Sequence, residues 1–176
     1  METNEFIKKM AAGWGNQSGK YNWSENWGMA PTQLTMPKFH PIRNNKKGFI
    51  NNIENETIKN ANFRKVLYTA PNSQLVLMNL HPGEELGTEV HPDGDQFFRF
   101  ESGNGIIIIN GRRSQVTDGS AVVVPAGAEH NVINNGYKDL KFYAIYSPPE
   151  HLDKIVRKTK TDAEKRHYEY NGFPTE

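Results

Sequence analysis

The feature that most restricts the fold is a regular alternation of short β-prone runs and turn clusters between residues 63 and 147. Runs of this length, separated by Gly, Pro, Asn and Asp at a spacing of about ten residues, are typical of antiparallel sandwiches and barrels. No helical period interrupts them. The sequence therefore predicts an all-β domain built from the runs FRKVLYT, QLVLMNL, QFFRFE, GIIIIN, AVVVP, HNVIN and LKFYAIYS.

One of these runs, IIII at residues 106–109, does not alternate between apolar and polar residues. The Asn110-Gly111 pair that follows it is a strong signal for a tight hairpin into RRSQV. A strand with apolar residues on both faces is expected to be covered on both faces. The second cover would be the N-terminal arm or another subunit, so we predict a homodimer.

The sequences that flank this region differ from it in composition. Residues 1–45 form an arm rich in Gly, Asn and Trp, which is either flexible or docked on the domain or on a partner subunit; its aromatic content favours docking. Residues 46–150 form the β-barrel domain. Residues 151–176 form a charged tail with a short helix, for which Thr161 and Glu164 have capping-box spacing and Gly172 follows the end.

Composition excludes several classes of function. The 176 residues suit one domain, and the net charge of +1 indicates neither nucleic acid nor an anionic membrane as a partner. There is no apolar run long enough to cross a membrane and no signal-like start, so we expect a cytoplasmic protein. Cysteine is absent, so any metal would be held by nitrogen and oxygen ligands.

Two fragments carry a candidate metal site. In EVHPDGDQ, Glu89 and His91 are two residues apart and share one face of an extended segment, and PDGD returns the chain so that Gln96 opens the next strand. In VPAGAEHNVIN, His130 would complete the set from a neighbouring strand. Two imidazoles, a carboxylate and an amide suit one divalent metal such as Mn, Fe, Ni or Zn, with Gln96 as a direct ligand or as a partner of a bound water.

The spacing of these fragments resembles the two motifs of the cupin family. The first motif is Gly, five residues, His-x-His, three or four residues, Glu, six residues, Gly, and here Glu89 replaces the first histidine and Gln96 replaces the glutamate. The second motif is matched at every position. The matching positions are Gly83, His91 and Gly103 in the first motif, and Gly119, Pro125, Gly127, His130 and Asn134 in the second.

The resemblance implies a double-stranded β-helix, or jelly roll, and a small-molecule ligand. The chain is similar to small single-domain cupins often labelled as resembling mannose-6-phosphate isomerase. This implies a metal-dependent isomerase, epimerase or lyase acting on a small oxygenated substrate such as a sugar; a non-haem metal dioxygenase or a non-catalytic binding module are the alternatives. Phe98 and Phe100 share the face of Gln96, so they are either core residues or substrate contacts, and Asn134 is a further pocket candidate. No dedicated general base is evident besides the candidate ligands.

Overall fold

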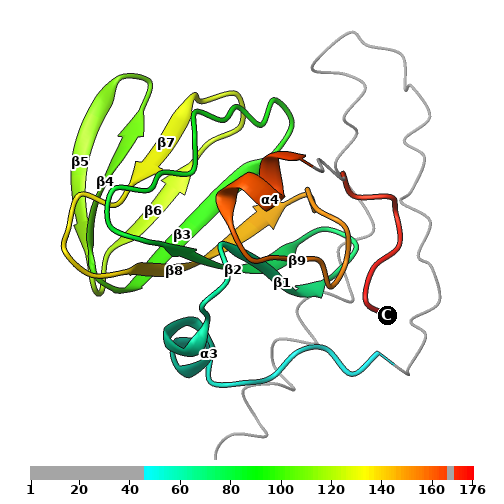
Figure 1. The fold of residues 1–176 in the computed structure, drawn as a ribbon. Helices are drawn as coiled ribbons and strands as arrows, with labels where there is room; N and C mark the ends of the chain where they lie inside the picture. The colour runs from blue at the N-terminus through cyan, green and yellow to red at the C-terminus, as the bar shows by residue number, and fades with distance from the viewer. Residues whose placement is uncertain (1–45, 166–168) are drawn as a thin grey trace, which may run out of the picture. The chain divides into compact units, whose positions relative to one another are not determined.

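A computed structural model of the chain describes residues 46–165 and 169–176, and the arm expected at 1–45 lies outside that range. The described strands form two antiparallel sheets (Figure 1). In order across the six-stranded sheet they are β6 (Ala121–Val124), β3 (Asp95–Ser102), β8 (Leu140–Ser147), β2 (Gln74–Leu80), β1 (Arg64–Thr69) and β9 (Val156–Arg157). The three-stranded sheet contains β5 (Arg112–Thr117), β4 (Asn104–Ile109) and β7 (His130–Ile133). The predicted jelly-roll fold of the cupins is confirmed.

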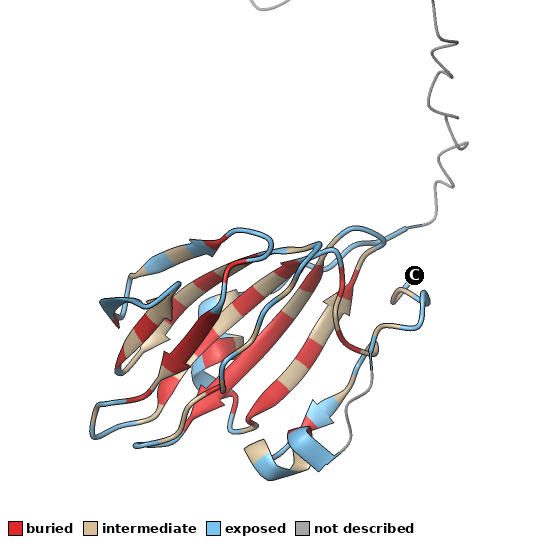
Figure 2. Cartoon of the chain, turned by 90° about the horizontal axis from the view of Figure 1, so that it is seen from above, coloured by how far each residue is buried: buried red, intermediate tan, exposed pale blue. Residues whose placement is uncertain are grey.

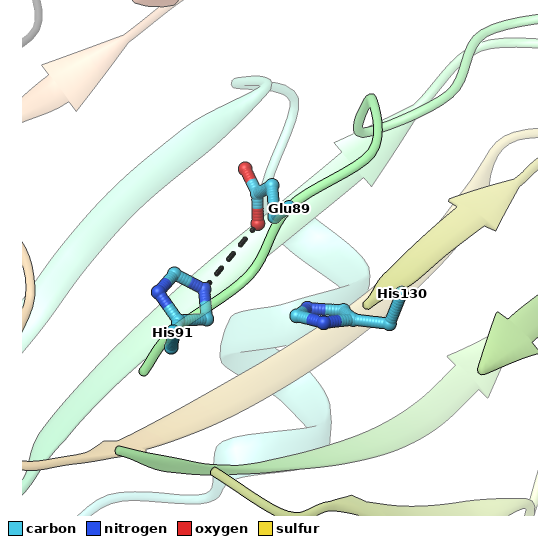
Figure 3. A group of neighbouring side chains, drawn as sticks. All are labelled: Glu89, His91 and His130. Carbon is cyan, nitrogen blue, oxygen red and sulfur yellow. Dashed lines mark ion pairs between the residues drawn. The ribbon is translucent and has the colours of Figure 1, made fainter. Parts of the chain in front are cut away.

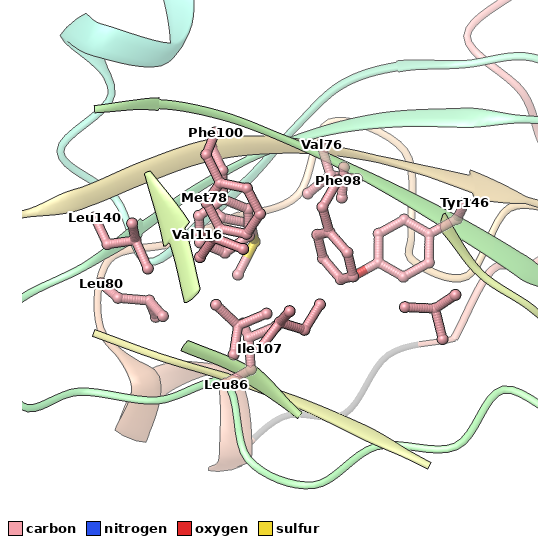
Figure 4. Close-up of a cluster of buried hydrophobic side chains, with 14 of the residues drawn as sticks. Val76, Met78, Leu80, Leu86, Phe98, Phe100, Ile107, Val116, Leu140 and Tyr146 are labelled. Carbon is pink, nitrogen blue, oxygen red and sulfur yellow. The ribbon is translucent and has the colours of Figure 1, made fainter. Parts of the chain in front are cut away.

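The core lies between the two sheets, and buried residues recur along the strands of both sheets (Figure 2). In β8 the burial pattern alternates along the whole strand, and in β3 it alternates from Asp95 to Phe100. Large side chains from both sheets meet in this layer (Figure 4), among them Val76, Met78, Leu80, Phe98, Phe100, Ile107, Val116, Leu140, Phe142 and Tyr146. A polar residue that lies on the same face of a strand as these apolar side chains therefore also points inward.

The β4–β5 hairpin turns where the sequence predicts it. Asn110 and Gly111 both have positive φ values, 46° and 77°, as a two-residue hairpin turn of this kind requires. Ile107 is buried in the core and Ile109 packs against it, whereas Ile106 and Ile108 lie half-buried on the other face of the strand. The run IIII thus has one core face and one partly exposed face within a single chain.

Two short helices flank the sheets. Helix α3 (Ile53–Lys59), which the sequence did not lead us to expect, begins at Asn52, whose side chain accepts a hydrogen bond from the Asn55 N–H at 2.9 Å. It packs against β2, β3 and β8, and the Lys141 ammonium of β8 donates to two carbonyls at its C-terminal end, those of Ile58 and Asn60.

Helix α4 (Lys160–Lys165) is the predicted short C-terminal helix, but its expected boundaries were wrong. Its cap is Thr159, whose hydroxyl accepts from the Asp162 N–H at 3.1 Å, and not Thr161. Glu169 already forms a β-bridge with His151, so the helix ends well before Gly172. The Asp162 carboxylate in turn accepts from the Lys158 N–H at 3.4 Å, one residue before the cap.

The C-terminal residues lie along β1. The Thr175 N–H donates to the Thr69 carbonyl, and the Glu176 carboxylate accepts from the N–H groups of Lys47 and Gly48.

Within the described residues, no helix has the length and apolar character needed to cross a membrane.

Candidate metal centre

The segment between β2 and β3, residues 81–94, brings two of the predicted ligands alongside β7. Glu89 and His130 face each other in an antiparallel bridge, in which the Glu89 N–H donates to the His130 carbonyl at 2.9 Å and the His130 N–H donates to the Glu89 carbonyl at 3.0 Å. The His91 carbonyl accepts from the Gly127 N–H at 2.8 Å. These backbone bonds hold together residues that are far apart in the sequence.

The side chains of Glu89, His91 and His130 converge on one point (Figure 3). Each offers one ligand atom, and these atoms lie within 4.8 Å of one another. Glu89 Oε2, His91 Nε2 and His130 Nε2 are all buried without a hydrogen-bond partner among the described residues. Because a buried polar atom without a partner is costly, three such atoms around one point fit a bound cation. The structure thus brings three of the four predicted ligands together.

Each of these three side chains is held by a further contact on the side away from the shared point. His130 Nδ1 lies 3.1 Å from the Ala128 carbonyl, which can only accept, so Nδ1 carries the proton and Nε2 keeps its lone pair. His91 Nδ1 lies 3.7 Å from Glu150 Oε2, and Glu89 Oε1 lies 3.5 Å from Arg64 Nη2. Contacts of this kind orient metal-binding histidines and carboxylates in proteins.

The three groups also change one another's acidity. The contact with Glu89 raises the pKa of His91, although burial acts in the opposite direction. Burial lowers the pKa of His130 and so favours its neutral imidazole. Burial opposes ionisation of Glu89 as well, but the contact with His91 and the charge of Arg64 outweigh it, and the pKa of Glu89 is lowered. The carboxylate is therefore ionised in its buried position.

Gln96, the fourth predicted ligand, lies on β3 with its side chain in the interior. It is 1% exposed, and both its Oε1 and its Nε2 lack a hydrogen-bond partner among the described residues. Its neighbours across the sheet are Val124 on β6 and Tyr146 on β8. Burial raises the pKa of the Tyr146 hydroxyl, which therefore stays protonated. An inward amide next to the Tyr146 hydroxyl can serve as a ligand or can hold a water.

The three pocket candidates from the sequence lie in the interior. Phe98 and Phe100 are fully buried, and the ring of Phe98 packs 6.0 Å from that of His130, measured between centroids. The Asn134 amide donates to the carbonyls of Leu80 and Lys138, both at 2.8 Å, and its oxygen accepts from the Gly136 N–H. None of the three lines the cavity beside His91. The Phe98 ring packs near the His130 ring, and the Asn134 amide links the end of β2 to the loop before β8.

A cavity of about 320 Å³ opens beside His91. Its lining includes the ring of Tyr146, which lies edge-on to His91 at 5.6 Å between centroids. The remaining lining residues are Val90, Pro92, Asp93, Gly94, Asp95, Pro148, Glu150 and Glu169. The cavity therefore borders the cluster at His91, and its size suits a small molecule.

Sequence reasoning missed Arg64, Tyr146 and Glu150. Arg64 had a readable signal, because it shares the inward face of its strand with Val66, where a charged residue needs a partner. Tyr146 is on the inward face of β8, but so are three ordinary core residues. Glu150 follows two prolines in a loop without any periodic pattern, so only the folded structure places it next to His91.

Comparison with known proteins agrees with the two-sheet fold. A family model described as a cupin domain matches residues 76–146. The uncharacterized protein YrkC of Bacillus subtilis is 46% identical over 123 residues, and the match covers 66% of this chain and 66% of YrkC. The uncharacterized protein L612 of Acanthamoeba polyphaga mimivirus is 41% identical over 114 residues, which cover 62% of this chain and 71% of L612.

A solved structure gives the same result. The crystal structure of BH2720 from Bacillus halodurans is 40% identical and superposes with a TM-score of 0.67, covering 69% of this chain and 97% of BH2720. An identity of 40% over 97% of BH2720 indicates a similarity in sequence as well as in fold. Together with the two sheets and the matching motifs, it shows that the chain belongs to the cupin family.

Proposed function

We propose that the protein is a metal-dependent enzyme that binds one divalent transition metal, Mn, Fe, Ni or Zn, and acts on a small oxygenated substrate such as a sugar or sugar derivative. The observation that carries this proposal is the convergence of three buried ligand atoms without hydrogen-bond partners among the described residues, on Glu89, His91 and His130, with His91 also lining an open cavity. The reaction class we favour is isomerisation, epimerisation or elimination.

The donor set suits such a metal. Ligand atoms about 2.1 Å from a zinc-sized ion lie roughly 3 to 3.5 Å from each other in tetrahedral or octahedral geometry. The 3.6 Å between Glu89 Oε2 and His91 Nε2 is close to that spacing. Gln96 supplies a neutral oxygen as a fourth ligand or as a partner of a bound water.

The residues around the site could handle a substrate and its protons. A bound divalent metal would supply Lewis-acid polarisation of a substrate oxygen. Glu150 lines the cavity and lies next to His91, so its carboxylate is placed to accept a proton from a molecule in the cavity. Tyr146 also lines the cavity, and its protonated hydroxyl can donate a hydrogen bond. Glu150 is thus a candidate for the base that the sequence alone did not reveal.

Substitution of the four candidate ligands tests the metal site. We expect His91→Ala, His130→Ala and Glu89→Ala to abolish measurable stoichiometric binding, because each removes one of three converging atoms. Gln96→Ala should weaken binding by about 10- to 100-fold if the amide acts through a water. The measurement is calorimetric titration of metal-free protein with Mn, Fe(II), Ni and Zn.

His81→Ala is the matched control, since His81 is an exposed histidine paired with Asp139 away from the cluster. Its metal affinity should equal that of the wild type, and thermal melting should show that all five variants are folded. Wild-type affinity in each of the four site variants would refute the site.

A dioxygenase is the second candidate, favoured by one observation. The cluster consists of two histidines and one carboxylate, the donor set typical of non-haem Fe(II) oxygenases. Metal analysis of protein purified without chelator, followed by oxygen-uptake assays, distinguishes a dioxygenase from the isomerase-type enzyme. Stoichiometric iron with substrate-dependent oxygen uptake would replace the isomerase-type proposal. A protein that binds small molecules but no metal would be a non-catalytic binding module.

A further inference from the structure

The cavity beside His91 is bordered by four carboxylates from three separate segments. Asp93 precedes β3 and Asp95 is its first residue, Glu150 follows β8, and Glu169 comes from the C-terminal segment. Acidic side chains thus line this one space from several segments of the chain. Their charges add up in a partly enclosed space, where a field of one sign is stronger than on an open surface.

Among the ion pairs that the structure gives for residues 46–165 and 169–176, none joins these carboxylates to a lysine or arginine. Glu150 lies within ion-pair distance of His91, at 3.7 Å. Asp95 Oδ1 accepts a hydrogen bond from the Ala126 N–H at 2.9 Å, which positions the carboxylate but leaves its charge in place. The guanidinium of Arg64 is already paired with Glu89 and is not part of the cavity lining.

A separate observation links this acidic space to the proposed metal site through His91. His130 is 2% exposed, its Nε2 has no hydrogen-bond partner, and its ring lies 5.5 Å from that of His91, measured between centroids. His91 in turn lines the cavity. A molecule in the cavity would therefore lie against His91, one of the three proposed ligands, and against the carboxylates.

We propose that the substrate of this site is an uncharged or positively charged oxygenated molecule, and that phosphorylated and carboxylated molecules are rejected. The inference rests on the proposed metal site and defines its substrate class. The carboxylates can accept hydrogen bonds from hydroxyl or ammonium groups, whereas a phosphate would meet like charges. The apolar side chains of Val90, Pro92 and Pro148 would contact the carbon skeleton.

Three catechols with one skeleton and different charges test this inference: 4-methylcatechol, dopamine and 3,4-dihydroxybenzoate. Their hydroxyl groups chelate a metal, and the group on the opposite side of the ring is neutral, cationic or anionic. We expect zinc-loaded protein to bind the neutral and cationic probes at least about tenfold more tightly than the anionic one. Calorimetry gives the three dissociation constants without any assay of activity.

A double variant, Asp93→Asn with Glu169→Gln, removes two of the charges without touching the ligand cluster. The double variant should bind 3,4-dihydroxybenzoate about tenfold more tightly than the wild type does, and its affinity for 4-methylcatechol should be unchanged. Because each probe is compared between two proteins, intrinsic differences between the probes cancel. Asp118→Asn, in the β5–β6 turn and outside the cavity lining, is the matched control and should change neither constant. The discrimination should also shrink at high salt.

The outcomes separate this inference from the metal site on which it rests. If zinc binds but the anionic probe binds as tightly as the neutral one, the charge-selective cavity is refuted and the metal site stands. If none of the three probes binds the zinc-loaded protein, the cavity gives no access to the metal and the inference is also overturned. If zinc does not bind, both proposals fall.

Discussion

Position 89 determines the charge of the candidate site. The family pattern has a histidine there and a glutamate at position 96, whereas this chain has Glu89 and Gln96, so the site keeps one carboxylate but at another place. In the structure that carboxylate sits opposite His130 and is paired through its second oxygen with Arg64. A buried anion without a partner would be costly. Arg64 on β1 therefore supplies the positive charge that a buried carboxylate at position 89 needs.

The part of the site that sequence could predict is the part fixed by local geometry. Glu89 and His91 share a face because they are two residues apart, and Gln96, Phe98 and Phe100 share one for the same reason. The contacts of Arg64 and Glu150 with this group depend on the packing of segments far apart in the chain. No spacing rule predicts such contacts.

The His81–Asp139 pair gives a test of pH dependence away from the cluster. The hydrogen bond with Asp139, 2.8 Å long, raises the pKa of His81, and although burial opposes it, the contact with His81 lowers the pKa of Asp139. His81 therefore adds stability that is lost as pH rises through its folded-state pKa. Asp139 adds stability that is lost as pH falls through its folded-state pKa.

Asp139→Asn should therefore return the pKa of His81 toward its ordinary value of about 6.5, as measured by NMR titration of the imidazole. The cost in unfolding free energy should stay below about 1 kcal/mol, because the side chains are 58% and 35% exposed and solvent screens the pair. Asp118→Asn is the control. An unchanged His81 titration in Asp139→Asn would show that the pair does not form in solution.

At the scale of the elements, the sequence predicted the strands and missed the short pieces. Each β-prone run from residue 63 to 147 contains a strand of the structure, because alternation and turn residues act over a few positions. Helix α3 has only seven residues and one fully buried side chain, Thr57, so it has no apolar stripe to detect. Strand β9 has two residues and exists only because β1 offers an edge.

Gly103, between β3 and β4, tests whether a motif glycine is needed for its conformation or for space. Its φ is +90°, and a Cβ there would lie 2.5 Å from the Asp139 carbonyl oxygen, which is backbone and cannot rotate away. Gly119 has a nearly equal φ of +84° but no atom within 4 Å of such a Cβ. The two positions therefore differ in crowding and hardly at all in backbone strain.

We expect Gly119→Ala to lower the unfolding free energy by about 1 kcal/mol, the cost of a left-handed conformation for alanine. Gly103→Ala should lower it by about 3 kcal/mol, since displacement of the neighbouring backbone adds to that cost. Urea denaturation of both variants provides the comparison. Equal losses would mean that the β8 end moves aside freely and that space is not the constraint.

At the scale of the whole molecule, the two sheets differ in how well one chain covers them. The outer face of the six-stranded sheet carries helix α3, which packs on β2, β3 and β8. The outer face of the three-stranded sheet has half-buried Ile106 and Ile108 of β4, with Ile133 of β7 opposite Ile106. Among the described residues, no helix packs there. An apolar row at this place is a natural contact for a second copy of the chain.

We therefore expect a homodimer that uses this face, with a mass by light scattering of about twice the 20.0 kDa of one chain at micromolar concentration. Ile108→Lys adds a charge at the end of the apolar row, beside Arg113 of β5, and should convert the protein to monomer, because an uncompensated charge in an interface is strongly unfavourable. Val123→Lys is the matched control, since Val123 is 65% exposed on β6 of the other sheet. This variant should leave the mass unchanged.

A wild-type mass of one chain would refute the dimer. A dimer that survives Ile108→Lys would place the contact on another face, where the edge strands β5 and β6 are the next surfaces to test.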